Sequence, residues 1–119
     1  SVLPDARTAF VEFYRSKAKE RIPKRVCQYA KQMGLTPTEV RIHDLKNRWA
    51  SCSPGGALNF HWRCMMAPLT ALDYIIVHEL AHIEQPNHTA KFWDLIEKVL
   101  PEYQQPKGWL RLHGAGLGL

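Results

Sequence analysis

Apolar side chains recur at every third or fourth position from about residue 4 to residue 33, a spacing that predicts amphipathic helix. The stripe consists of Ala6, Phe10, Phe13, Tyr14, Ala18, Val26, Tyr29, Ala30 and Met33. Pro23 suits the first turn of a helix, so we expect it to divide this stretch into two helices, with Gly34 ending the second. We interpret the aromatic part of the stripe as core packing rather than as a cofactor site.

The pattern changes after residue 38 to an alternation of apolar and polar residues, which predicts strands. We expect the first strand at residues 39–45, the second at residues 48–51 and the third at residues 57–62. The sequence Ser53-Pro54-Gly55-Gly56 between the last two is a strong turn signal. Short strands that follow one another in this way predict a small antiparallel meander.

Helical spacing returns in the last third of the chain. It predicts a long helix over residues 69–85, a second over 87–100 with Asn87 as its cap, and a short one near 106–113. We expect the glycine-rich tail, residues 114–119, to be flexible. Helices at both ends with a small sheet between them predict a single α+β domain that spans the chain.

Composition agrees with one folded domain and excludes several other classes of protein. The chain has 119 residues and a mass of 13.7 kDa, and 45% of its residues are hydrophobic, which is too apolar for a disordered protein. No apolar run approaches the roughly 20 residues of a membrane-spanning helix. The N-terminal residues also lack the basic and then apolar pattern of a signal peptide.

The net charge of +5 is concentrated at the N-terminal end. Residues 1–31 hold eight basic and three acidic side chains, whereas the remainder of the chain holds eight of each. We therefore expect residues 1–34 to form a basic helical segment. Such a face is most often simply solvated, but it also suits an acidic partner or a nucleic acid.

The motif His78-Glu79-Leu80-Ala81-His82 carries the clearest chemistry in the sequence. In a helix, the i, i+4 spacing places both imidazoles on one face, one turn apart, where they can bind one metal ion. Glu79 follows the first histidine and is placed to exchange protons with water at that metal. Imidazole ligands with one open position are typical of catalytic Zn²⁺.

A third ligand must come from beyond this helix, because the chain has to turn back toward the metal. His88 is the best candidate, since it lies six residues after His82 and Pro86-Asn87 supplies a turn. Acidic side chains are the alternative, because many zinc proteases complete the site with a downstream carboxylate. The acidic candidates are Glu84, Glu97 and Glu102.

Other side chains with chemical potential give weaker signals. His61 on the third strand could face a cleft, but a strand histidine is more often just half-buried. Tyr103 could donate to a developing oxyanion, although a packed tyrosine is the commoner case. The cysteines lack paired spacing, which favours reduced thiols in or near the core and a cytoplasmic protein. They are Cys27, Cys52 and Cys64.

Four short motifs occur in a distinctive order along the chain. They are Arg48-Trp49-Ala50-Ser51-Cys52, Leu58-Asn59-Phe60-His61-Trp62-Arg63, His78-Glu79-Leu80-Ala81-His82 and Asn87-His88 followed by Phe92-Trp93. In this order they resemble the YgjP-like metallopeptidase domain, a zincin family related to SprT- and Spartan-like proteases. The resemblance runs from about Tyr14 to Trp109. Ala50 departs from the family, which usually has glycine there, so a turn that needs glycine would be altered.

The resemblance implies a zincin-like fold, with N-terminal helices, a small antiparallel sheet, a helix that carries the metal motif and a C-terminal backing helix. It implies that His78, His82 and His88 bind Zn²⁺ and that Glu79 is the general base. It also implies that the strand at residues 58–62 forms the upper rim of a cleft, where an extended peptide pairs with its edge.

We therefore expect a zinc-dependent metallopeptidase that acts on a peptide or protein. The first alternative is a nucleotide pyrophosphatase acting on UTP at the same metal, as some members of this family are described. Arg41, Arg48 or Arg63 would then have to lie at the cleft, and the sequence has no glycine-rich phosphate loop. The second alternative is a non-enzymatic zinc-stabilised module that binds nucleic acid through its basic helices, against which the intact Glu79 argues.

Overall fold

The computed structural model describes residues 2–46 and 48–113, and it confirms an α+β architecture. The elements in chain order are α1 (Val2–Met33), β1 (Glu39–His43), β2 (Ala50–Cys52), β3 (Ala57–His61), the 3-10 helix η1 (Trp62–Met66), α2 (Leu69–Glu84), α3 (Ala90–Val99) and α4 (Gln104–His113). The last three helices are present as predicted, although Thr89 rather than Asn87 is the N-cap of α3. The tail expected to be flexible, residues 114–119, lies outside the described residues.

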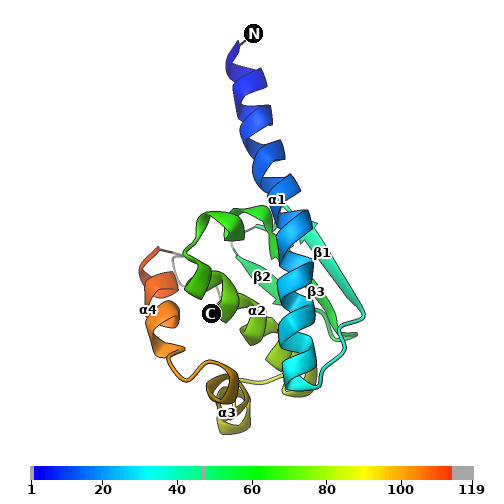
Figure 1. The fold of residues 1–119 in the computed structure, drawn as a ribbon, viewed down its shortest axis with the longest axis vertical. Helices are drawn as coiled ribbons and strands as arrows, with labels where there is room; N and C mark the ends of the chain where they lie inside the picture. The colour runs from blue at the N-terminus through cyan, green and yellow to red at the C-terminus, as the bar shows by residue number, and fades with distance from the viewer. Residues whose placement is uncertain (1, 47, 114–119) are drawn as a thin grey trace.

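Helix α1 is one continuous helix, so the predicted division at Pro23 is wrong. A proline inside a helix removes one backbone hydrogen bond and crowds the preceding turn. Burial holds the helix together on both sides of Pro23. The buried side chains, each at most 6% exposed, are Ala18, Ile22, Val26 and Ala30. Their spacing of four places them along one face of the helix, which packs against the rest of the fold (Figure 1).

The N-terminal half of α1 projects beyond the rest of the fold (Figure 1). Phe10 and Phe13 are therefore 48% and 55% exposed, which contradicts the prediction that the aromatic stripe is core. Both rings lie against Tyr14, and Phe10 also lies near Trp62 of η1, with ring centroids 6.3 Å apart. Although α1 has 32 residues, no described helix is both long enough and apolar enough to cross a membrane.

The three strands form a mixed sheet in the order β1-β3-β2 rather than the predicted antiparallel meander. β2 and β3 pair antiparallel across the predicted turn, in which Gly56 has a φ of 89°, whereas β1 and β3 pair parallel. β3 takes the central place because it is the most apolar strand, with Leu58 and Phe60 fully buried. Alternate residues of β1 are exposed, as expected for a strand at an edge.

Helix α2 is the most buried helix and carries much of the hydrophobic core. It packs against α1, α3, α4 and β2. Arg25 of α1 donates two hydrogen bonds to the carboxylate of Asp73 of α2, at 2.7 and 2.9 Å, and so joins the two longest helices. A helix that is fixed from several sides gives the histidines that it carries a rigid support.

Candidate metal centre

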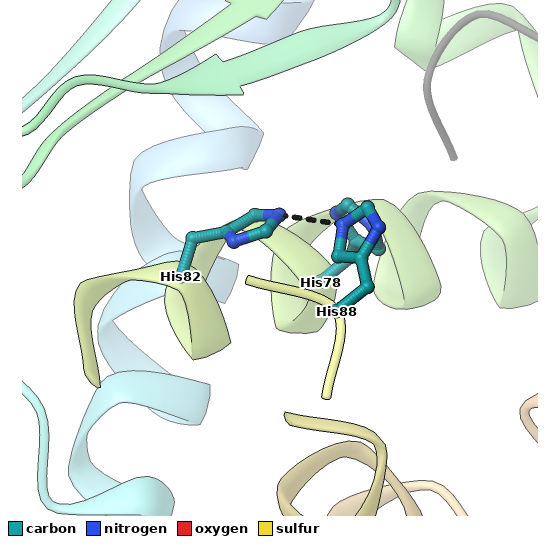
Figure 2. Close-up of side chains that lie close together, drawn as sticks. All are labelled: His78, His82 and His88. Atoms are coloured by element: carbon teal, nitrogen blue, oxygen red, sulfur yellow. Dashed lines mark hydrogen bonds between the residues drawn. The ribbon is translucent and has the colours of Figure 1, made fainter. Parts of the chain in front are cut away.

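Helix α2 and the loop that follows it bring three histidines together (Figure 2). His78 and His82 lie one turn apart on α2, as their spacing predicts. The helix ends at Glu84, and Pro86 favours a change of direction because it cannot continue a helix. The chain then turns back and places His88 beside the other two histidines before α3 begins.

The nitrogen atoms of these histidines converge closely. One nitrogen from each imidazole lies within 4.8 Å of the other two. The Nε2 atoms of His82 and His88 are 3.0 Å apart, and Figure 2 marks this contact. The ring centroids of the three imidazoles are 4.9 to 5.3 Å apart. Three nitrogens at these distances can be ligands of a single metal ion.

Hydrogen bonds orient two of the imidazoles and leave one nitrogen of each for another partner. Nδ1 of His82 donates to the backbone carbonyl of Gln85 at 3.2 Å, and Nδ1 of His78 donates to Oε2 of Glu79 at 2.9 Å. Nε2 of His78 is buried and has no hydrogen-bond partner among the described residues. Imidazoles held in this way by a carbonyl or carboxylate are typical of metal ligands, so the residues fit a divalent metal such as Zn²⁺.

An aromatic layer lies against the three histidines. The fully buried ring of Phe92 has its centroid 4.6 to 5.2 Å from those of the imidazoles. Trp93 stacks on Tyr103, and Tyr103 stacks on Tyr74, so Tyr103 is packed as we interpreted it. Burial, together with the charges of the two neighbouring histidines, lowers the pKa of His88 and favours its neutral, metal-binding form.

The histidines open into a cavity of about 870 Å³. The three residues of β2 line it, together with residues of α2 and of the loop that holds His88. Residues 58–62 do not line the cavity, so the expectation that they form its rim is wrong. β3 also has no free edge for a peptide, because it is hydrogen-bonded to β1 on one side and to β2 on the other. β2 is the edge strand at this cavity, and among residues 2–46 and 48–113 no strand pairs with the other side of its backbone.

The other candidate ligands lie apart from the imidazole cluster. Nδ1 of His61 accepts a hydrogen bond from the backbone N–H of Arg63 at 2.9 Å and caps η1. His61 does not line the cavity. The three acidic candidates are exposed and do not line the cavity either. They are Glu84, Glu97 and Glu102.

One of the three arginines considered as phosphate ligands lies at the cavity. Arg48, which immediately precedes the buried Trp49 and β2, lines it. Arg41 forms an ion pair with Glu39 on β1, the strand at the other edge of the sheet. The guanidinium of Arg63 stacks over the ring of Trp49, 4.4 Å from its centroid.

Cys52 packs against the core, in agreement with the prediction of thiols in or near the core, but it also lines the cavity, which the sequence did not predict. Burial, together with the negative charge of Glu79, raises the pKa of its thiol to about 11. The sequence signal for this position is that Cys52 ends the motif Arg48-Trp49-Ala50-Ser51-Cys52.

Comparisons with known proteins give the fold and the family of this chain. The structure resembles the crystal structure of the metallopeptidase zymogen of Pyrococcus abyssi abylysin, with a TM-score of 0.70 and 24% sequence identity. The match covers 77% of this chain and 93% of that one. None of the curated protein sequences matches the chain. The YgjP-like family, described as a metallopeptidase domain, matches residues 3–113, and the chain therefore belongs to the YgjP-like family.

Proposed function

We propose that the protein is a zinc-dependent peptidase in which three histidines hold the metal and Glu79 is the general base. The observation that carries this proposal is the convergence of nitrogens from His78, His82 and His88 at a cavity that Glu79 also lines. Membership of a family with a metallopeptidase domain supports a hydrolase. The free cysteines of the described chain support a reducing, cytoplasmic location.

The three imidazoles differ in how firmly the protein holds them in position for a metal ion. His78 and His82 are fixed by helix α2 and by their Nδ1 hydrogen bonds, whereas His88 comes from a loop. A zinc ion held by this set would supply a Lewis acid that polarises the scissile carbonyl and lowers the pKa of water.

Glu79 is placed to move protons between water and the leaving group. It is 3% exposed, lines the cavity and accepts a hydrogen bond from His78. As a base, it would take a proton from the attacking water, whose oxygen adds to the carbonyl carbon of the peptide. As the C–N bond breaks, Glu79 would return that proton to the leaving nitrogen, which regenerates the carboxylate.

The edge strand β2 is suited to hold the substrate. Residues 50–52 line the cavity, and within the described part of the chain β2 pairs with β3 alone, through one of its edges. An extended peptide could add to the other edge, so that main-chain hydrogen bonds align it with the histidines. Main-chain pairing of this kind would not itself depend on the side chains of the substrate.

Hydrolysis of UTP is the second candidate, because Arg48 lines the cavity and could bind a phosphate. Arg41 and Arg63 are engaged elsewhere, which leaves fewer cations for a triphosphate. Nucleic-acid binding through α1 rests only on the basic composition of that helix. We therefore rank peptide hydrolysis first.

The decisive experiment compares turnover of an unfolded protein and of UTP by the zinc-loaded wild type and by Glu79→Gln. We expect the wild type to cleave the unfolded protein, and we expect Glu79→Gln to lose at least ~100-fold in rate, since general-base catalysis contributes about 10²–10⁴-fold. The zinc content of the variant, measured by atomic emission, should stay at the wild-type level.

Glu84→Gln is the matched control, because Glu84 is an exposed carboxylate at the end of the same helix. It should keep wild-type activity. Full activity of Glu79→Gln would remove Glu79 from the mechanism. Turnover of UTP alone, abolished in Glu79→Gln, would favour the pyrophosphatase over the peptidase.

A further inference from the structure

Arg48 differs from the ion-paired arginines of this protein. It is exposed, it lines the cavity of the histidines, and it forms no ion pair with any carboxylate in the described ranges. The arginines that do form ion pairs are Arg15, Arg25 and Arg41, and all three point to carboxylates away from the cavity. Arg48 therefore offers a free guanidinium at the place where a substrate would lie.

The cavity itself holds little negative charge to neutralise this cation. Among the described residues, Glu79 is the one carboxylate that lines it, and Glu79 is buried and already accepts a hydrogen bond from His78. An arginine at such a cavity has no internal carboxylate to bind, so an external anion is its natural partner.

A second cation lies near the histidines on the side of α4. The ammonium group of Lys107 lies 3.8 Å from the ring centroid of Trp93, and that ring is 5.7 Å from the ring of His88. Lys107 forms no ion pair within the described part of the chain. The surroundings of the histidines are thus positive at two points that come from different elements, which favours an anionic substrate.

We propose that Arg48 binds a carboxylate of the peptide substrate and so selects peptides that are acidic on one side of the scissile bond. This inference rests on the proposed peptidase function. A guanidinium can form two parallel hydrogen bonds with a carboxylate, which gives both affinity and orientation. Arg48 precedes β2, so it lies at one end of the edge on which the peptide would pair, and the preference should be one-sided.

Two sources can supply this carboxylate, namely an acidic side chain and the C-terminal carboxylate of a peptide. Quenched fluorescent peptides distinguish them. One series carries Glu, Gln or Lys at successive positions before and after the cleaved bond, with an amidated C-terminus. A second series carries Gln throughout and ends in either a free carboxylate or an amide.

We expect the zinc-loaded wild type to favour the peptide with a carboxylate at one position by about tenfold in kcat/KM, mainly through a lower KM. The reason is that charge-assisted hydrogen bonds are stronger than neutral ones. Arg48→Gln should abolish this preference, and Arg48→Glu should shift it toward Lys. Arg41→Gln is the matched control, since Arg41 is an exposed arginine on the opposite edge strand, and it should keep the wild-type preference.

Equilibrium binding separates this inference from the proposed function. Fluorescence anisotropy would compare labelled Glu and Gln peptides on the Glu79→Gln protein, with and without Arg48→Gln. Tighter binding of the Glu peptide that disappears with Arg48→Gln would support the role of Arg48. This conclusion would hold even if the zinc-loaded wild type cleaved none of the peptides, and that result would contradict the peptidase proposal alone. Equal binding of both peptides, or a preference that survives Arg48→Gln, would overturn the inference.

Discussion

The three described cysteines lie in different environments, although all are small thiols of one chain. Cys27 on α1 is exposed, whereas Cys52 lines the histidine cavity and Cys64 is fully buried. Burial raises the pKa of Cys52 to about 11 and that of Cys64 to about 12. A raised thiol pKa favours the neutral form, which is unreactive toward alkylating agents.

We therefore expect iodoacetamide at pH 8 to modify Cys27 first in the native protein. Cys52 should react on the order of 100-fold more slowly, because little of its thiol is ionised until the pH nears 11. Cys64 should react only on unfolding. Peptide mapping by mass spectrometry gives the three rates, and equal rates for Cys27 and Cys52 would contradict the assigned environment of Cys52.

For single residues, the sequence predicts those positions that are set by residues nearby in the chain. The convergence of His78 and His82 follows from helical spacing alone, and a turn at Pro86 made His88 a reasonable third member. The placement of Cys52 at the cavity could not be predicted in the same way. It depends on which strand lies beside α2, and that is a property of the sheet.

Among the elements, α1 shows how tertiary packing overrides a local signal. Pro23 predicts a break, yet the helix continues through it because its buried face is anchored before and after the proline. The proline should then remain a source of instability within an otherwise well-packed helix.

Pro23→Ala should stabilise the protein by up to about 3 kcal/mol, because alanine restores a backbone hydrogen bond and has the highest helix propensity. Urea unfolding followed by circular dichroism measures the change. Lys24→Ala is the control at an exposed neighbouring position, and we expect a change of no more than about 0.5 kcal/mol. A destabilised Pro23→Ala would show that the proline is needed for the geometry of α1.

The order of the strands could not be read from the sequence, although the strands themselves could. Alternation predicts that residues 39–43 and 57–61 are extended, but it says nothing about which edges they share. The strand order depends on how the whole sheet is buried against the helices, and the most apolar strand, β3, lies at the centre. The bounds of α2, in contrast, were predicted to within one residue, because they depend on local signals.

For the whole molecule, the proposed metal would add a further link between helix α2 and the loop that follows it, which are already joined by hydrogen bonds. His78 and His82 belong to the rigid helix α2, and His88 belongs to the loop that leads to α3. A ligand that binds only the folded state stabilises it by RT ln(1 + L/Kd), where L is the free ligand concentration, so the stabilisation grows with the logarithm of that concentration.

Zinc at 100 times its dissociation constant should stabilise the fold by about 2.7 kcal/mol, which corresponds to a rise in Tm of about 10 °C for a chain of this size. Scanning calorimetry with zinc and with EDTA measures this shift. His88→Ala should reduce the shift strongly. His43→Ala, at an exposed position of β1, should leave it unchanged. An identical shift in both variants would remove His88 from the metal site.

Phe92 belongs both to the hydrophobic core and to the wall of the histidine cluster. Any change in its volume moves the imidazoles and alters core packing at the same time. Selection for metal affinity and selection for folding therefore act on the same atoms, and neither property can drift independently here. Changes in specificity would then fall on exposed positions at the rim such as Arg48, because Ala50 of β2 is itself part of the core.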